Sequence, residues 1–371
     1  MELICSLFPP PTPEELAAVE GHRSTTEDSS MASEMLQPLW DFLAKQVPDR
    51  VNPNAITAAG LATTVSQALL LTAANPSFSS ALPRALCLAS FFSVWLYLTL
   101  DAIDGKHARR TGKASPLGHF VDHAADAINS LPLTMIWAQT MQMTRAQTVV
   151  LLAVIYSGFL TTTWEEYHTQ CLSFGRVSGP TEGILLLSLC MVASAVFSPR
   201  VWAFQPLSPH VSLSLSGAVV WGSAALLLAT HIPNSLRNVK KKTKTGFRKT
   251  TAALLGSQSS FGVLLLYGLL RVGSMSSPGF LFFLLSAGSI SAQTINEIIF
   301  ASLAKRKYPP PTPPLHLLFC WCVLAKALPS IYRHETGFFA LLALASTAYL
   351  CLWHFAVCSA LCKHFNRPFL R

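Results

Sequence analysis

The sequence predicts an all-α, polytopic membrane protein with about ten transmembrane helices. Hydrophobic residues make up 51% of the 371 residues and charged residues only 12%. A soluble domain carries about twice that share of charge. Apolar segments also recur at the length, about 20 residues, that a helix needs to cross a bilayer. We place them at residues 54–75, 82–103, 117–142, 147–164, 181–199, 211–232, 251–270, 278–300, 314–331 and 337–361.

The distribution of basic residues supports this topology. Clusters of Lys and Arg lie within residues 106–113, 237–249, 305–307 and 363–371, and the opposite connections carry only isolated arginines. With ten spans and a cytosolic N-terminus, all four clusters fall on the cytosolic side, where basic residues concentrate in membrane proteins. The net charge of +9 therefore indicates membrane orientation, and we expect no nucleic-acid partner.

The pattern divides the chain into three parts. Residues 1–34 are rich in Pro, Glu, Ser and Thr, which predicts a disordered cytosolic tail. Residues 35–236 would hold an interfacial helix and a six-span catalytic core. Residues 237–371 would hold a basic cytosolic loop, four further spans and a basic C-terminal tail. The interfacial helix is expected over residues 36–47, where an apolar face lies opposite a polar one; a helix packed on protein is the alternative.

The stretch over residues 101–126 carries four carboxylates between apolar runs. Asp101 and Asp104 are three residues apart and Asp122 and Asp126 are four apart, so each pair shares one face of a helix. Like charges so placed repel, and the low dielectric near a bilayer strengthens the repulsion. A cation must therefore neutralise them. Hard oxygen ligands from two helices suit Mg²⁺ or Mn²⁺, with two ions expected.

The residues between these carboxylates fit a nucleotide diphosphate. Gly105, Ala108 and Gly118 leave room for a ligand to approach the backbone. Arg109 offers a planar fork of donors that matches a phosphate. The pattern D-x-x-D-G-x-x-A-R-x8-G-x3-D-x3-D has every specified position filled, which is very improbable by chance because each position matches roughly one time in fifteen.

This stretch resembles the signature of the CDP-alcohol phosphatidyltransferase family. Two segments are most similar to the choline/ethanolamine phosphotransferase branch. They are DGKHARRTGKASPLGHFVDH, within the stretch above, and WEEYHTQCLSFGRVSGPTEG, at residues 164–183. The resemblance implies transfer of phosphoethanolamine or phosphocholine from CDP-ethanolamine or CDP-choline to diacylglycerol, with CMP as the second product. It also implies a homodimer in the endoplasmic reticulum membrane, with the Golgi as the alternative. The distribution of basic residues predicts an active site that faces the cytosol.

The resemblance also implies roles for single residues. The base that accepts the acceptor's proton would be His123, whose imidazole titrates near neutral pH, with Asp126 as a metal ligand; the alternative is Asp126 as the base. Asn54 would contact the CDP moiety, although a helix N-terminal position after a proline explains it equally well. Lys113 would assist Arg109 at the diphosphate.

Other polar positions of the two segments have either a functional or a structural explanation. Residues 165–168 would either shape a substrate pocket or form a charged loop at the membrane boundary. His107 and His119 show no partner by spacing and are expected at the cytosolic surface. Members of the branch usually have glutamine at the position of His107 and often have glycine at the position of Ala124. These departures put the choice of amino-alcohol in doubt.

Three rival interpretations remain open at this point. A relative that uses CDP-diacylglycerol with a soluble alcohol would share the signature, but the length of the chain and the second segment favour the amino-alcohol branch. A transporter would carry charges at midplane depth over several spans, whereas here they gather at one edge. A non-catalytic scaffold would not need the complete set of carboxylates.

Overall fold

The structure, a computed structural model, describes residues 8–22, 25–28, 30–174, 180–206, 212–243, 246–310, 312–366 and 369. Its α-helices are α2 (Pro13–Glu20), α3 (Met31–Gln46), α4 (Pro53–Ala74), α5 (Arg84–Arg110), α6 (Pro116–Thr140), α7 (Arg145–Thr169), α8 (Pro180–Phe197), α9 (Leu215–Leu226), α10 (Ile232–Lys242), α11 (Phe247–Arg271), α12 (Ser277–Leu303), α13 (Pro313–Ala327) and α14 (Glu335–His364). Two short strands, β1 (Thr25–Asp28) and β2 (Cys171–Phe174), pair in parallel. The 3-10 segments are η1 (Pro199–Ala203) and η3 (Pro329–His334), and η2 (Leu227–His231) is a π-helical turn.

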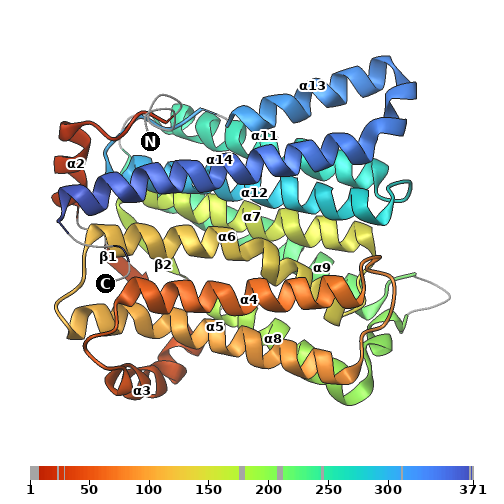
Figure 1. The fold of residues 1–371 in the computed structure, drawn as a ribbon, viewed down its shortest axis with the longest axis horizontal. Coiled ribbons are helices and arrows are strands. Elements are labelled where there is room, and N and C mark those ends of the chain that lie inside the picture. Colours follow the sequence, from red (N-terminus) through yellow and green to blue (C-terminus); the bar gives the residue numbers. More distant parts are fainter. Residues whose placement is uncertain are drawn as a thin grey trace.

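The long helices run back and forth along the longest axis of the molecule (Figure 1). Many of them begin at a polar cap residue whose side chain accepts a backbone N–H: Asn52, Ser115, Thr144, Ser214 and Ser276. The π turn η2 joins α9 to α10 directly before Pro233, which has no N–H to continue the regular ladder. α9, η2 and α10 therefore form one span, Leu215–Lys242.

Within the described residues, eight helices are long and apolar enough to cross a membrane. α6 is more polar and α13, with 15 residues, is shorter, but both lie among the others. These ten correspond one to one with the ten predicted segments, so the predicted fold class is confirmed. The protein is a multi-pass membrane protein.

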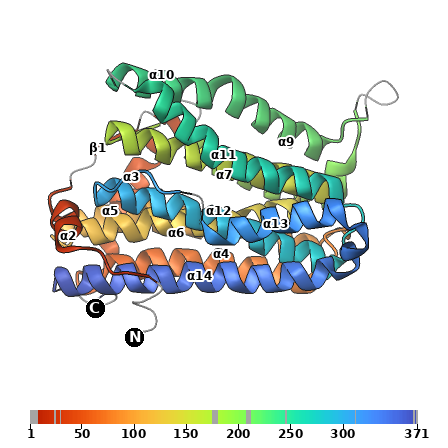
Figure 2. The ribbon, with the colours of Figure 1, turned by 90° about the horizontal axis from the view of Figure 1, so that it is seen from above.

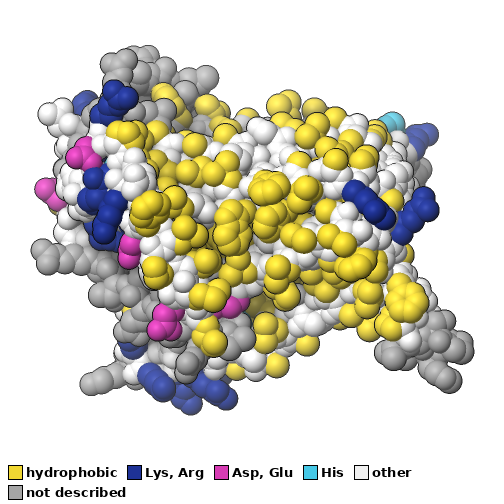
Figure 3. Space-filling model, turned by 90° about the horizontal axis from the view of Figure 1, so that it is seen from below, with side chains coloured by type: hydrophobic (Ala, Val, Ile, Leu, Met, Phe, Trp, Pro, Cys, Tyr) yellow, Lys and Arg dark blue, Asp and Glu magenta, His cyan; other side chains and the backbone are white. Residues whose placement is uncertain are grey.

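The surface agrees with a bilayer environment. Figure 3 shows hydrophobic side chains over the middle of the molecule and charged side chains gathered at its two ends. Many large apolar side chains of the spans are exposed, as expected where lipid replaces water; they include Leu70, Phe92, Leu189, Leu228, Leu266 and Leu344.

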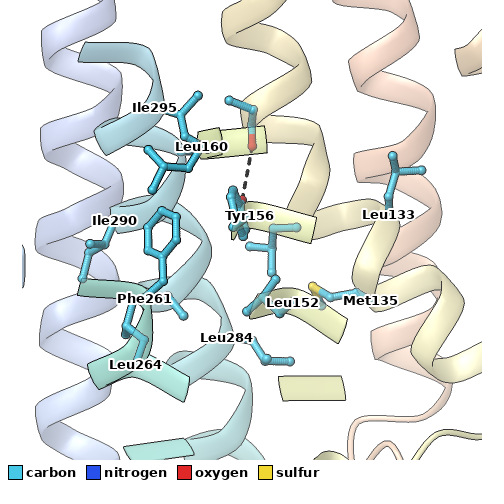
Figure 4. Close-up of a cluster of buried hydrophobic side chains, with 14 of the residues drawn as sticks. Leu133, Met135, Leu152, Tyr156, Leu160, Phe261, Leu264, Leu284, Ile290 and Ile295 are labelled. Atoms are coloured by element: carbon cyan, nitrogen blue, oxygen red, sulfur yellow. Dashed lines mark hydrogen bonds between the residues drawn. The ribbon is translucent and has the colours of Figure 1, made fainter. Parts of the chain in front are cut away.

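The core lies where α6, α7, α11 and α12 meet. Figure 4 shows this cluster of buried side chains, in which the hydroxyl of Tyr156 donates to the backbone oxygen of Ala127 at 3.2 Å. α12 is the most enclosed of the candidate spans and Leu215–Lys242 the least. In Figure 2 this least enclosed span lies at the edge of the bundle, beside α7 and α11.

Two expectations about the termini and loops need correction. Residues 1–34, expected to be disordered, contain α2, β1 and the start of α3 where the structure describes them. The basic loop expected from residue 237 is helical as far as Lys242. The expectation for residues 1–7 and for much of the C-terminal tail lies outside the described residues.

The expected interfacial helix exists as α3, but it has two apolar faces. Trp40 and Ala44 pack on Ile56 and Leu98, which fits the alternative of a helix packed on protein. A second row is exposed and consists of Met31, Met35, Leu39 and Phe42. The helix therefore contacts the bundle with one face and offers the other to its surroundings.

Candidate active site

The turn between α5 and α6 brings the carboxylates together. α5 ends at Arg110, and Gly112 takes the left-handed conformation (φ +67°) that lets the chain reverse. Ser115 then caps α6 by accepting from the N–H of Gly118 at 3.1 Å, with Pro116 in the first turn. The short connection sets the end of α5 beside the start of α6, so both aspartate pairs occupy one end of the bundle.

Three of the four predicted ligands form a compact group. Asp101, Asp122 and Asp126 each offer an oxygen, and these oxygens lie within 4.8 Å of one another. Asp104 is not part of that group. Its buried carboxylate accepts a hydrogen bond from Thr57 on α4, and it is close enough to Asp101 and Asp122 to repel both.

The group fits a divalent cation by its own chemistry. Among the described residues, no Lys, Arg or His forms an ion pair with any of the four aspartates. Tyr97 supplies one neutral partner, because its hydroxyl donates to Asp126 at 2.6 Å. The charge of Arg109 offsets only part of the charge on Asp104 and Asp122, so carboxylates at this density need a further cation. Hard oxygen donors make Mg²⁺, Mn²⁺ or Ca²⁺ the fitting class of ion.

A cavity of about 450 Å³ opens beside these carboxylates. All six residues predicted to bind the nucleotide line it: Asn54, Gly105, Ala108, Arg109, Lys113 and Gly118. Asp104 and Asp122 line it too. A Cβ atom placed on Gly105 would lie 3.4 Å from the guanidinium of Arg109 and one on Gly118 3.7 Å from Asn54, so side chains at either position would take up space in the cavity.

Two helix N-termini border the same cavity. Asn52, Pro53 and Asn54 belong to the start of α4, and Ser115 and Gly118 to the start of α6. The N-terminus of a helix carries a partial positive charge and attracts anions. The cavity therefore combines carboxylates at one wall with a positive field at another, which suits a metal-bound phosphate.

The basic residues at the end of α5 divide into two groups. Lys106 pairs with Asp41, Arg110 with Asp49 (both 2.6 Å), and Lys113 donates to the backbone oxygen of Asp49 at 2.6 Å. These contacts fix α3, through Asp41, and the loop between α3 and α4, through Asp49. The guanidinium of Arg109, in contrast, forms no hydrogen bond or ion pair with any described residue; it is exposed at the cavity wall, near enough to Asp104 and Asp122 to offset part of their charge.

Lys113 therefore differs from its expected role. It lines the cavity, but its ammonium group is already bonded to the loop, with a second contact to the oxygen of Val51 at 3.1 Å. His107 also departs from expectation, because it is fully buried and its Nε2 lies 3.0 Å from the same oxygen. His107 thus contacts the backbone of the loop before α4, and this contact explains why it is not at the surface.

His123 lies in a second cluster, behind the carboxylates. Its ring is 4.2 Å from that of His119, and His119 Nε2 is 3.6 Å from Glu166 on α7. His119 lines the cavity, whereas His123 and Glu166 do not. Sequence reasoning missed the position of His119, although it stands on the face of Asp122, three residues away.

The residues at positions 165–168 form the last turns of α7 and not a loop. Glu165 accepts from Asn238 at 2.8 Å, Glu166 pairs with His119, and Tyr167 donates to the backbone oxygen of Arg306 at 2.6 Å. Of these contacts, the one made by Glu166 connects α7 to the active-site residue His119. Residues 175–179 of the second segment lie outside the described residues.

Comparison with known proteins identifies the family. A sequence model described as CDP-alcohol phosphatidyltransferase matches residues 50–272, which include every site residue above. The chain belongs to the CDP-alcohol phosphatidyltransferase family. Membership makes the chain a transferase and confirms the family resemblance of the signature.

Similar proteins whose functions are named include choline/ethanolaminephosphotransferases and cholinephosphotransferases. A choline/ethanolaminephosphotransferase of Saccharomyces cerevisiae is 29% identical over 333 residues, 86% of this chain and 85% of that relative. One of Arabidopsis thaliana is 35% identical over 53% of this chain and 51% of its own length. A cholinephosphotransferase of Saccharomyces cerevisiae is 33% identical over 47% and 45%. The chain thus spans most of the first relative and about half of the other two.

Proposed function

We propose that the protein transfers phosphocholine or phosphoethanolamine from CDP-choline or CDP-ethanolamine to diacylglycerol, giving phosphatidylcholine or phosphatidylethanolamine and CMP. The observation that carries this proposal is the cavity of about 450 Å³. It places six candidate nucleotide contacts beside two of the four aspartates, at the end of the bundle. The names of the similar proteins support the amino-alcohol as the group transferred.

The chain's own residues would position the CDP-alcohol. The guanidinium of Arg109 forms no hydrogen bond or ion pair within the described part of the chain, so it is available to the diphosphate. The N-termini of α4 and α6 add their partial positive charge. Asp101, Asp122 and Asp126 would hold one of two Mg²⁺ or Mn²⁺ ions, and Asp104 with Asp122 the other; these ions would neutralise the diphosphate and polarise its phosphoryl oxygens.

His123 is the base that we favour. Asp126 belongs to the three-carboxylate group and accepts from Tyr97, which leaves it poorly placed to take a proton. His123 follows Asp122 directly and lies against His119, which pairs with Glu166. A carboxylate behind the histidines would stabilise the imidazolium that forms when the acceptor hydroxyl loses its proton.

The topology supports a cytosolic site. The helices alternate in direction, so the connections rich in Lys and Arg share one end with α2, α3 and both termini (Figure 1). Basic ends face the cytosol. We place the protein in the endoplasmic reticulum membrane, with the Golgi as the alternative, and as a homodimer. CDP-alcohol would enter from the cytosol and diacylglycerol laterally from the bilayer.

The test is an assay of purified protein in micelles. Diacylglycerol is supplied with CDP-choline or CDP-ethanolamine, and Mg²⁺, Mn²⁺ or a chelator is added; CMP and lipid product are measured. We expect product that depends on the metal and is lost in Asp126→Asn and His123→Ala. Turnover of CDP-diacylglycerol with a soluble alcohol, and none with either amino-alcohol donor, would contradict the proposal.

A further inference from the structure

The segment that precedes the bundle is anchored to it by an ion pair. α2 is closed at its start by a capping box in which the Thr12 side chain and Glu15 each accept a backbone N–H. Both Glu15 oxygens also bind Arg306, one of them through Nη2 at 2.6 Å. Val19, on the same helix, is fully buried. Arg306 lies just beyond α12, so α2 is held at the cytosolic end of the most enclosed helix.

A second anchor lies on α8. The Ser30 hydroxyl donates to Glu182 at 2.5 Å and the N–H of Ala32 donates to the same carboxylate at 3.2 Å. Ser33 and Thr181 share a hydrogen bond of 3.1 Å between their hydroxyls. In addition, β1 pairs with β2, which directly follows α7. The segment is therefore tied to the bundle on both sides of residue 22.

His22 lies between the two anchors, next to the active site. Its ring is stacked on that of His119, with centroids 6.0 Å apart and planes inclined by 30°. His123 is next to His119 as well, at 4.2 Å. His119 thus has two neighbouring rings, one from the N-terminal segment and one from its own helix, while its Nε2 lies 3.6 Å from Glu166. Side chains enclosed in this way keep a single orientation, which a catalytic constellation requires.

We propose that residues 12–22 and 30–33 form a strap that completes the active site, and that His22 is a positioning residue that holds His119 between Glu166 and the substrate cavity. This inference rests on the proposed function. The role of His22 is one of packing: its Nε2 is buried and has no hydrogen-bond partner among the described residues. A phenylalanine ring would therefore serve at this position and would remove an unsatisfied nitrogen.

Docking of the strap can be tested without any assay of activity. Hydrogen–deuterium exchange of α2 is measured in the full-length protein and in Glu15→Gln, Arg306→Gln and the double variant. Glutamine at position 15 can keep the capping box, so Glu15→Gln removes only the charge of this residue. We expect faster exchange in each single variant and no further increase in the double variant, because both changes break one contact. Glu14→Gln, one residue away and exposed, is the control and should exchange like wild type.

Additive effects of the two substitutions, or rapid exchange of α2 already in wild type, would overturn the docked strap. These measurements stand even if the wild-type protein turns over no CDP-alcohol, so failure of the strap and failure of the proposed function are separable.

The role of His22 is tested by steady-state kinetics. We expect His22→Ala to lower kcat by about ten- to a hundred-fold, the scale for a misplaced catalytic group, with KM for the CDP-alcohol unchanged. His22→Phe should recover most of kcat. His334→Ala, at the opposite end of the molecule, is the control and should behave as wild type. An unchanged kcat in His22→Ala, or a Phe variant as impaired as the Ala variant, would overturn the assignment.

Discussion

The hydroxyl of Tyr97 on α5 donates to the carboxylate of Asp126 on α6 at 2.6 Å. Tyr97 is buried and reaches the group formed by Asp101, Asp122 and Asp126. Loss of a partner that orients a ligand carboxylate typically lowers the affinity for the metal about ten- to a hundred-fold. This contact therefore offers a test of the metal site that leaves all four aspartates in place.

We expect Tyr97→Phe to raise the concentration of Mg²⁺ or Mn²⁺ needed for half-maximal activity by about ten- to a hundred-fold. Titration of activity with the metal measures this shift. Tyr267→Phe is the matched control: its hydroxyl also donates to a carboxylate at 2.6 Å, that of Glu335, but far from the site. An equal metal requirement in Tyr97→Phe and wild type would separate Tyr97 from the metal site.

The sequence predicted the spans, and it also predicted that the carboxylates would lie in pairs on helix faces, for a physical reason. Apolar length and the three- and four-residue spacing of Asp101, Asp104, Asp122 and Asp126 are local properties of single helices. The partners of the site residues come from other helices: Thr57 of α4 donates to Asp104, and Glu166 of α7 pairs with His119. No spacing within one segment reveals which faces will meet.

The N-terminal segment shows the same limit. Its composition, poor in apolar residues, predicts disorder because the segment cannot bury a core of its own. Its stability comes from groups supplied by the bundle, Arg306 for Glu15 and Glu182 for Ser30. Likewise, Lys113 was expected at the nucleotide because of its charge, while the loop before α4 takes its ammonium group.

Arg109 and Arg110 are neighbours with different tasks, which makes them a matched pair. Arg109 lines the cavity, and its guanidinium is bonded to no described residue, whereas Arg110 binds Asp49 and the backbone oxygen of Val47, both at 2.6 Å. We expect Arg109→Lys to raise KM for the CDP-alcohol about tenfold, because an ammonium group cannot reproduce the bidentate contact of a guanidinium with phosphate. Arg110→Lys should leave this KM unchanged.

Steady-state kinetics at saturating diacylglycerol measures both variants. Equal KM values for the two variants would contradict a special role of Arg109 at the diphosphate.

Docking of α2 should depend on pH through Glu15. The hydrogen bonds from Arg306 hold the pKa of Glu15 below its ordinary value of 4.5, against the opposing effect of burial. A carboxyl group whose pKa is lowered by folding stabilises the fold above its unfolded pKa, and this stabilisation is lost as the pH falls through the folded pKa. The contribution of Glu15 should therefore be constant above about pH 4.5 and decline below it.

The measurement is the difference in thermal unfolding midpoint between wild type and Glu15→Gln from pH 3 to pH 7. We expect a difference at neutral pH that shrinks toward zero in acid. A difference that grows as the pH falls would have the wrong sign and would refute the ion pair as its source.

α6, which carries part of the site, packs closely against α12 at Gly288. A Cβ atom on Gly288 of α12 would lie 2.5 Å from Cδ2 and 2.8 Å from Cβ of Leu131 on α6. Leu131 cannot escape by a change of its side chain alone, since its Cβ is fixed to the backbone. Gly288→Ala must therefore displace α6, the helix that carries Asp122, His123 and Asp126, away from α12.

We expect Gly288→Ala to cost about 1–3 kcal/mol, the range for overpacked cores, and to lower kcat because the carboxylates move relative to α5. Gly222→Ala is the control, because a Cβ atom there meets nothing within 4 Å and alanine favours a helix by about 0.5–1 kcal/mol. Thermal unfolding and activity in micelles measure both variants. If Gly288→Ala unfolds at the wild-type temperature with full activity, the close contact of α6 with α12 does not set the geometry of the site.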